Sequence, residues 1–402
     1  MKYKIGELVE IIDGDRGKNY PQQHEFSDKG YCLFLNTGNV TKGGFSFDSN
    51  QYITKEKSDL LRKGKLQRHD IVYTTRGTVG NVAFYSDSVP YEHIRINSGM
   101  IIIRPNEDLV CTEFLYQILK SEYYRLYFRR YCTGSAQPQL PIKNFIMIEL
   151  DIPNLQYQHH IADVLSTYDN LIENNQKQIK LLEEAAQRLY KEWFVDLRFP
   201  GHENVKIVDG VPEGWKQCTL GEMASILRRG ISPKYDDGGK YLVISQKCIR
   251  RSIMDTGEAR RESKVYAPEL NLQDADTVIC STGTGTLGRI GQVCGAHPDT
   301  TFDSHVTLVR TENYQNFFYQ AIKSQQEFLM SMGRGSTNQQ ELYRNVIESL
   351  QILVPTQEIL NKAEKILSTM HHKVTALNSQ ILLLIETRDR LLPKLMSGEL
   401  EV

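Results

Sequence analysis

The sequence predicts a chain built twice on one plan. Each copy is a mixed α/β (α+β) domain followed by a long helix, and the two helices pack as an antiparallel coiled coil with pseudo-twofold symmetry. Three observations predict this fold: segments repeat about 202 positions apart, each copy ends in a long heptad pattern, and each copy begins with alternating strand-like and helical runs. A two-copy chain behaves like a dimer fused head to tail, so we expect a partner or ligand with two similar halves.

The repeat is clearest where the long helical patterns begin. Ile152-Pro153 opens the first pattern, and Val354-Pro355 opens the second. Matching residues follow in the same order, in the first copy Leu165, Ser166, Thr167, Ile179, Leu182, Glu184, Arg188 and Leu189, and in the second copy Leu367, Ser368, Thr369, Ile381, Leu384, Glu386, Arg390 and Leu391. Nearer the start of each copy the offset is larger, 208 between Gly80 and Gly288. Insertions have therefore accumulated in the loops of the front domain.

The composition is that of an ordinary globular protein. With 402 residues, 40% of them hydrophobic, the chain can bury more than one core, and two or three domains are expected. No run of about 18 apolar residues exists to span a bilayer, and the N-terminal residues contain no apolar signal core. The seven cysteines are an odd number without a Cys-x-x-Cys pair. These features predict a cytoplasmic protein with reduced cysteines and no membrane contact.

Charge is unevenly spread along the chain. Residues 1–150 hold 20 Lys and Arg against 17 Asp and Glu, and residues 215–350 hold 16 against 15. The connecting residues 151–214 hold 6 against 11, so the excess of acid lies there. This distribution is compatible with a nucleic-acid binder whose phosphate contacts are local, although a pI near 6.8 argues against a strongly basic footprint.

The elements of the two front domains are expected in the same order. In the first copy, strands are predicted at 31–35, 71–75, 82–85 and 100–103, and a helix at 113–128. In the second copy, strands are predicted at 241–245, 277–280, 291–294 and 306–309, and a helix at 317–330. The predicted boundaries are a first domain at 1–150, a helical region at 151–195, a linker at 196–214, a second domain at 215–350, and a second helical region with its tail at 351–402.

A heptad seam runs through each helical region. In the first, apolar residues from Ile161 to Trp193 alternate spacings of four and three, with only Asn175 polar. The second seam runs from Leu367 to Leu391, with Arg388 as its exception. Helices of some 40 residues would each be about 60 Å long. Because each helix follows its own domain, we expect antiparallel packing with one domain at each end; the alternative is two separate core helices, each under its own domain.

Three segments outside the front domains carry a further pattern. They are Leu189 to Gly201, reading Leu-Tyr-Lys-Glu-Trp-Phe-Val-Asp-Leu-Arg-Phe-Pro-Gly, then Pro212 to Trp215, reading Pro-Glu-Gly-Trp, and Leu391 to Leu400 at the end of the second seam. Here the chain resembles the specificity subunits of type I restriction-modification systems, whose central region ends in Leu-Tyr-x-x-Trp-Phe-Val-Asp and whose second recognition domain commonly opens with Pro-x-Gly-Trp. The resemblance covers nearly the whole chain, in the family's order.

One family motif differs between the two copies. The motif Pro-x-x-x-x-Gln-x-x-Ile-Ala opens the first helical region as Pro153, Gln158, Ile161 and Ala162. The equivalent positions of the second region are Pro355, Leu360, Ala363 and Glu364. The two regions therefore depart from each other at this motif.

The resemblance implies a non-catalytic DNA-reading subunit. Two target recognition domains each read one half of a bipartite, asymmetric site in double-stranded DNA, and the helices set the distance between the half-sites. Two modification subunits dock on this scaffold and methylate adenine with S-adenosylmethionine, so no cofactor is expected on this chain itself, and restriction subunits can join the complex. A rigid spacer suits half-sites that lie about one helical turn, 34 to 36 Å, apart.

Other chemistries are weakly supported by the sequence. Gly283 to Gly288 fits the dinucleotide-binding pattern Gly-x-Gly-x-x-Gly, but the residues after it continue as a strand, which favours a hairpin turn. Asp236, Glu262 and Lys264 form a nuclease-like set that the first copy lacks. The paired histidines have no further ligands at usable spacing, so no metal site is expected. The chain contains no Pro-Pro dipeptide, so the base-gripping motif of amino-methyltransferases is absent and no catalytic residue is assigned.

Base reading needs polar side chains on exposed loops, and three pairs of loops are polar in both copies. The candidate DNA-binding residues are Arg16, Lys18, Thr75, Arg76, Arg130, Ser135 and Gln137 in the first copy, and Arg228, Arg229, Thr284, Arg289, Arg334, Asn338 and Gln339 in the second. Solvated turns are the alternative reading of each residue. A coiled-coil adaptor presenting two ligand-binding domains to proteins is the rival function, and it should show clustered aromatic residues on these loops, which carry Gly, Ser, Thr, Gln and Arg instead.

Overall fold

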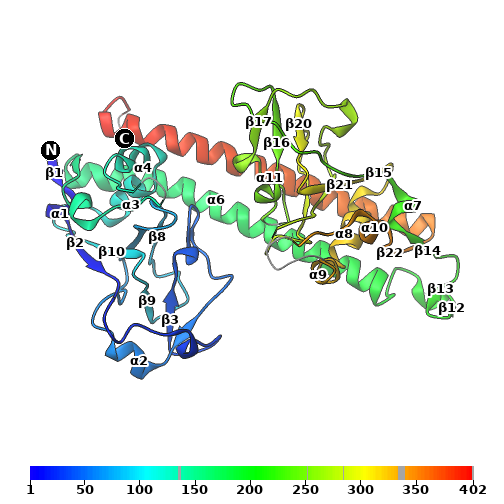
Figure 1. The fold of residues 1–402 in the computed structure, drawn as a ribbon, viewed down its shortest axis with the longest axis horizontal. Helices are drawn as coiled ribbons and strands as arrows, with labels where there is room; N and C mark the ends of the chain where they lie inside the picture. Colours follow the sequence, from blue (N-terminus) through cyan, green and yellow to red (C-terminus); the bar gives the residue numbers. More distant parts are fainter. Residues whose placement is uncertain (135–136, 251, 284, 334–339, 401–402) are drawn as a thin grey trace. The chain divides into compact units, whose positions relative to one another are not determined.

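The chain forms two compact units. The structure, a computed structural model, describes residues 1–134, 137–250, 252–283, 285–333 and 340–400. Unit 1 comprises Met1–Ile172 and Leu383–Val402, and unit 2 comprises Glu173–Leu382. The long helices α6 (Leu155–Tyr190) and α11 (Gln357–Ser397) each contribute to both units (Figure 1). Each unit therefore contains one front domain and a part of both helices.

Domain 1, in unit 1, is built on two small sheets. The four-stranded antiparallel sheet has the order β2 (Val9–Asp13), β10 (Met100–Pro105), β7 (Ile71–Thr74) and β8 (Val82–Phe84). The remaining strands are β6 (Tyr52–Ile53), β3 (Cys32–Leu35) and β9 (Ile94–Ile96) in a three-stranded sheet, and the pairs β1 (Lys2–Lys4) with β11 (Glu149–Asp151) and β4 (Val40–Thr41) with β5 (Gly44–Phe45). Its helices are α1 (Ile5–Leu8), α2 (Lys55–Leu60), α3 (Thr112–Lys120), α4 (Glu122–Arg129) and α5 (Ile142–Phe145).

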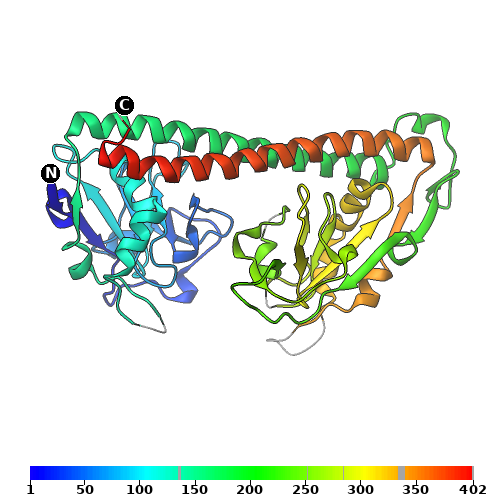
Figure 2. The same ribbon diagram turned by 90° about the horizontal axis from the view of Figure 1, so that it is seen from above.

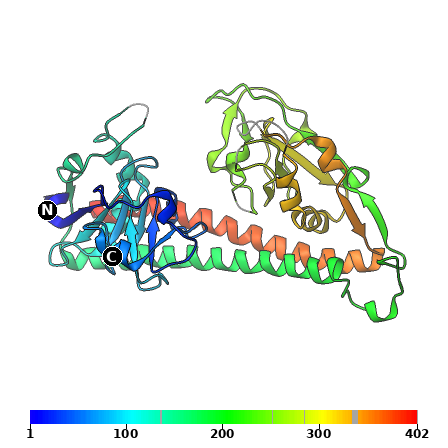
Figure 3. The same ribbon diagram turned by 60° about the horizontal axis from the view of Figure 1, so that its bottom comes forward.

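Domain 2, in unit 2, repeats this topology. Its four-stranded antiparallel sheet has the order β15 (Ala224–Arg229), β21 (Val306–Thr311), β18 (Thr277–Cys280) and β19 (Ile290–Gln292). The remaining strands are β17 (Arg260–Glu262), β16 (Tyr241–Ile244) and β20 (Thr300–Phe302) in a three-stranded sheet, β14 (Lys216–Thr219) paired with β22 (Gln351–Val354) (Figure 3), and β12 (Ile207–Val208) with β13 (Val211–Pro212). Its helices are α7 (Leu220–Met223), α8 (Gln315–Lys323), α9 (Gln326–Ser331) and α10 (Arg344–Glu348), and the π-helical turn η3 (Lys191–Val195) follows α6.

The two long helices pack against each other in both units, and they run antiparallel. In unit 1, the core joins Leu165 of α6 to Leu392 of α11. In unit 2, Asn175, the polar exception of the first seam, is buried and its Nδ2 donates to Oε1 of Gln380 over 3.3 Å. The prediction was of two mixed α/β domains, each followed by a long helix that packs against the other long helix, and it is confirmed (Figure 2). The alternative of separate core helices is wrong.

The predicted single helix in each front domain is wrong, because each is two helices. In domain 1, Ser121 takes an extended conformation (φ −61°, ψ 136°) that ends α3 and begins α4. In domain 2, the helix breaks at Ser324 and Gln325. The apolar spacing continues across both breaks, so periodicity alone gives no sign of them. The predicted strands are present with ends that differ by at most two residues.

The motif that differs between the copies connects a domain helix to a long helix in both units. In unit 1, Oε1 of Gln158 on α6 accepts the backbone N–H of Cys111, just before α3, over 2.9 Å. In unit 2, Oε2 of Glu364 on α11 accepts the backbone N–H of Phe317 in the first turn of α8, over 2.9 Å. Each side chain satisfies free N–H groups at the start of a domain helix and so ties that helix to a long helix. The residue that makes this contact is Gln158 in the first copy and Glu364 in the second. Glu364 lies one helical turn beyond Leu360, the position equivalent to Gln158.

The Gly-x-Gly-x-x-Gly segment joins two antiparallel strands, β18 and β19, so the prediction of a hairpin turn is confirmed. No helix in the described ranges is long and apolar enough to cross a membrane. The domain boundaries drawn from the sequence stay predictions.

Candidate nucleic-acid interface

Two of the polar loops of domain 1 meet at one end of the four-stranded sheet, where β7 finishes and β10 begins. The backbone N–H groups of Thr75 and Arg76 both donate to the carbonyl oxygen of Gly99, over 2.9 and 3.2 Å. The loop that follows α4 joins them, because the N–H of Leu140 donates to the carbonyl oxygen of Thr75 over 3.0 Å. We call this group of loops cluster 1.

The loop after β2 completes cluster 1. Nη2 of Arg16 donates to the carbonyl oxygen of Ser98 over 3.3 Å. The loop is held by the carboxylate of Asp15, which accepts the backbone N–H groups of Gly17 (2.6 Å) and Arg62 (2.8 Å). The hydrogen bond from Gly17 is the main cause that lowers the pKa of Asp15. The carboxylate of Asp15 thus ties this loop to the residues that follow α2.

Domain 2 assembles its polar loops in the same way. The N–H of Ser281 donates to the carbonyl oxygen of His305, and the N–H of Leu342 donates to that of Ser281, each over 2.8 Å. Nε of Arg229 donates to the carbonyl oxygen of Ser304, as Arg16 does to Ser98 in domain 1. We call this group cluster 2. The structure thus brings the predicted loops of domain 1 together, and in domain 2 it brings together the described loops after β15 and β18; the third predicted loop of domain 2 lies outside the described residues.

A glycine makes the close approach possible in each cluster. A Cβ atom on Gly14 would lie 2.3 Å from the carbonyl oxygen of Asn97, and one on Gly230 would lie 2.2 Å from that of Asp303. No side chain fits at either distance, so the loop after the first sheet strand can lie on its neighbour only with glycine there.

Five predicted residues are exposed and have no side-chain hydrogen bond or ion pair to another described residue. They are Lys18, Arg76, Arg130, Gln137 and Arg228. Arg130 lies over the ring of Tyr127, with 6.0 Å between the guanidinium carbon and the ring centroid. These side chains can turn toward a ligand without breaking an existing bond.

Other predicted residues already have partners inside the clusters. Thr75 is buried, and its hydroxyl donates to the carbonyl oxygen of Gly99 over 3.1 Å. Arg229 forms an ion pair with Glu341, and Arg289 is half-buried in the turn before β19. Thr75 and Arg229 therefore hold the loops in place. Ser135, Thr284, Arg334, Asn338 and Gln339 lie outside the described residues.

Sequence reasoning missed the loop at the centre of each cluster. In cluster 1 the side chain of Asn97 accepts the N–H of Gly99 over 2.9 Å, and in cluster 2 the side chain of Asp303 accepts the N–H of His305 over 2.8 Å. The imidazole of His305 is exposed, and its Nδ1 hydrogen-bonds Oγ1 of Thr282. A signal was present, because Asn-Ser-Gly and Asp-Ser-His are equivalent positions of the repeat with a short polar residue that favours turns.

The nuclease-like set does not form a site. Glu262 is fully buried on β17, where Oε2 accepts the backbone N–H of Lys234 over 2.8 Å, and Asp236 is bonded to Ser263. Among the residues that the structure describes, no group of three side chains could hold a metal ion.

Comparison with known proteins identifies the family. Residues 1–184 and 212–387 match the family described as type I restriction modification DNA specificity domain, one match for each copy of the repeat. These matches cover most of the chain, so the chain belongs to this family of DNA specificity domains.

Relatives of the same class align along most of the chain. The MjaIX specificity subunit of Methanocaldococcus jannaschii is 26% identical over 343 residues, covering 83% of this chain and 78% of the relative. The HindI specificity subunit of Haemophilus influenzae is 23% identical, and the alignment covers 96% of this chain and 98% of the relative. The crystal structure of the type I system S subunit from M. genitalium has the same fold, with a TM-score of 0.53 at 20% identity, covering 98% of this chain and 96% of that one.

Proposed function

We propose that the chain is the non-catalytic specificity subunit of a type I restriction-modification complex and that clusters 1 and 2 each read one half of a bipartite DNA site. The observation that carries this proposal is the pair of equivalent loop clusters, each at the same end of the same sheet within a DNA specificity domain. Two clusters of one design suit two half-sites on one duplex.

The exposed side chains of the clusters have the chemistry for both kinds of DNA contact. Arg76 and Arg228 can bond guanine edges or phosphates, Lys18 and Arg130 can neutralise phosphates, and Gln137 can pair with adenine. The predicted loops carry Gly, Ser, Thr, Gln and Arg, a composition that suits DNA better than a protein partner and is the observation against the adaptor function.

The helix pair is proposed to dock two modification subunits, which would carry S-adenosylmethionine. Leu181 on α6 is 64% exposed, and Leu383 on α11 is 63% exposed. The two leucines are equivalent positions of the repeat, 202 apart. A pair of matching apolar positions on the outside of the helices suits two copies of one partner.

The proposal is tested by DNA binding of the assembled complex. We expect Arg76→Ala and Arg228→Ala to weaken binding to the recognised duplex, and Arg344→Ala to leave it unchanged, because Arg344 is exposed on α10 and bonded to Glu348 of its own helix. Affinity is measured by fluorescence anisotropy at a fixed salt concentration. Equal binding by the wild-type complex and both cluster variants would contradict the assignment of the clusters to DNA.

A further inference from the structure

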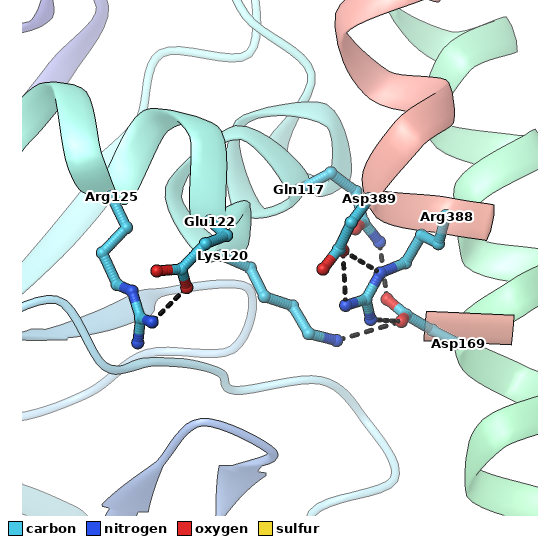
Figure 4. A network of polar contacts seen from close by, with 7 residues as sticks. All are labelled: Gln117, Lys120, Glu122, Arg125, Asp169, Arg388 and Asp389. Carbon is cyan, nitrogen blue, oxygen red and sulfur yellow. Dashed lines mark hydrogen bonds and ion pairs between the residues drawn. The ribbon is translucent and has the colours of Figure 1, made fainter. Parts of the chain in front are cut away.

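A buried ion network joins three elements within unit 1. The carboxylate of Asp169 on α6 accepts hydrogen bonds from Gln117 and Lys120 of α3, over 2.6 and 3.0 Å, and from Nη1 of Arg388 on α11, over 2.6 Å (Figure 4). Arg388 also bonds Asp389 over 2.8 Å. We call this group junction 1. It fastens domain 1 to α6 and α11 at once.

The charges of junction 1 are balanced and mostly shielded from water. The side chains of Lys120, Asp169 and Arg388 are 15%, 19% and 11% exposed. Burial disfavours the charged form of Asp169, but the charges of Lys120 and Arg388 outweigh it and hold the pKa of the carboxyl below its usual value. Charges in such a place are tolerated only while each has its partner.

The equivalent place in unit 2 is built differently. His371 occupies the position of Asp169, 202 residues later, and Ala186 occupies the position of Arg388, 202 residues earlier. His371 is buried, with Nε2 2.8 Å from Oδ1 of Asp274 and Nδ1 3.1 Å from Oε1 of Gln292. Ala186 is buried in the apolar core. We call this group junction 2.

We infer that the two junctions make the helix pairing heterotypic, so that α6 pairs with α11 and rejects the α6 of a second copy. Two α6 helices paired in the same antiparallel register would set Asp169 opposite Ala186, and Asp169 would lose its arginine. Two α11 helices would set Arg388 opposite His371, which places two buried basic groups together. Like pairing thus breaks the ion pair between Asp169 and Arg388 on both sides, whereas unlike pairing preserves it. In a like pair Asp169 would keep only its partners on α3, and Arg388 would keep only Asp389.

This inference rests on the proposed function and extends it. A pair of α6 helices would carry two copies of domain 1 and would present the same loop cluster twice, which suits a symmetric DNA site. Unlike pairing keeps one domain of each kind in every assembly. Selective pairing is needed during synthesis, because the end of α11 is made 207 residues after the end of α6. At roughly 5 to 20 residues per second, the seam of α6 waits about 10 to 40 s for its partner during synthesis.

The test uses the whole chain cut at one place. A protease site is introduced in the exposed linker at 201–204 and cleaved after folding, so that all residues are present in two fragments held by the helix pair. Labelled and unlabelled cut proteins are mixed and warmed until labels exchange, which proves that the fragments separate and pair again. Native mass spectrometry then counts pairs of unlike and like fragments.

Random pairing gives unlike pairs twice as often as like pairs of either one kind. We expect the wild-type ratio to exceed this value at least about tenfold, an advantage of roughly 1.4 kcal/mol. The double variant Ala186→Arg with His371→Asp places an aspartate and an arginine at these two positions of both helices, and like pairs should then approach the statistical share. Arg388→Ala, a milder change, should raise the share of like pairs in the same direction. The matched control is Lys177→Ala with Arg390→Ala, since these exposed side chains pair only within their own helices, with Glu173 and Glu386.

Statistical pairing of the wild-type fragments would overturn the inference, as would wild-type selectivity in both junction variants. Binding of the uncut wild-type complex to its DNA site is measured in parallel. Loss of selectivity with DNA binding retained refutes only the heterotypic pairing, whereas absence of sequence-specific binding refutes the proposed function.

Discussion

At the scale of single residues, the central loops of the two clusters carry Gly99 in one copy and His305 in the other. The backbone around these positions is the same, because Asn97 and Asp303 accept the equivalent N–H groups. An exposed side chain that is present in only one of two loops with the same backbone hydrogen bonds is suited to distinguishing one half-site from the other. The difference can be tested by removing the imidazole.

The variant His305→Gly gives cluster 2 the residue of cluster 1. We expect it to relax preference at one base pair of one half-site, by about 1 to 3 kcal/mol, because a lost base contact acts only where that base lies. The measurement is binding of the assembled complex to a panel of single-base variants of the site. Uniform weakening across the panel would instead assign His305 to phosphate contact.

A phosphate contact has a different signature. Arg130→Ala should weaken binding to all sequences alike and reduce the slope of log affinity against log salt by about 1, because one fewer counterion is released. Gln137→Ala, seven residues along the same loop, should leave the slope unchanged and alter preference in one half-site. A variant of Arg130 that changes sequence preference would show that the residue reads a base.

Junction 1 should make the free energy of unfolding depend on pH in the acid range. Removing the charge with Asp169→Asn should destabilise the chain by about 1 to 3 kcal/mol at pH 7, since Lys120 and Arg388 lose an ionised partner. The pKa of Asp169 is lowered in the folded state, so its contribution is fully present above the usual value of 3.8 and is lost as the pH falls through the folded value. Denaturant unfolding of both proteins should converge at low pH. A difference that persists unchanged there would contradict the pairing.

At the scale of elements, the two long helices were predictable, whereas the breaks in the shorter helices and the meeting of the loops were not. The heptad seams from Ile161 and Leu367 predict two long helices, because a spacing of 3.5 residues can be recognised in the sequence without knowing the rest of the fold. The break at Ser121 was missed because it lies between two apolar stripes that stay in phase. The meeting of Arg16 and Ser98 was missed because 82 residues separate them, and only the sheet brings them together.

The length of the helices should set the distance between half-sites. Deleting Gln176 to Leu182 together with Asn378 to Leu384 removes one heptad from each seam and about 10 Å of helix, or about three base pairs. We expect the recognised half-sites to move closer, as measured by selecting bound duplexes from a pool with varied spacers. Deleting only one heptad is the control and should abolish assembly, because the seams no longer match. An unchanged spacer in the double deletion would refute the claim that helix length sets the distance between half-sites.

At the scale of the whole molecule, the duplication was the part most open to prediction. A second copy of every core element implies two similar units, and both the matching sheets and the two family matches agree with this. The individual DNA contacts stay predictions, because Arg76 and Gln137 are exposed side chains to which no residue in the described part of the chain gives a fixed direction.

The purified chain should neither methylate nor cut DNA by itself. Methyl transfer from radiolabelled S-adenosylmethionine is expected only after a modification subunit is added, because the sequence contains no Pro-Pro dipeptide and therefore lacks the base-gripping motif. The control is the modification subunit alone on the same duplex. Transfer by the chain alone would show that a catalytic site has been overlooked.

The measurement that tests the account most directly is the sequence recognised by the assembled complex, obtained by selecting bound duplexes from a random pool. It is done for the wild type and for variants in one cluster at a time, Arg76→Ala with Gln137→Ala in cluster 1 and Arg228→Ala with His305→Gly in cluster 2. We expect a bipartite sequence in which each pair of substitutions alters one half and leaves the other half and the spacer unchanged. A continuous recognised sequence, or a change in both halves from one cluster, would contradict the reading of one half-site by each domain.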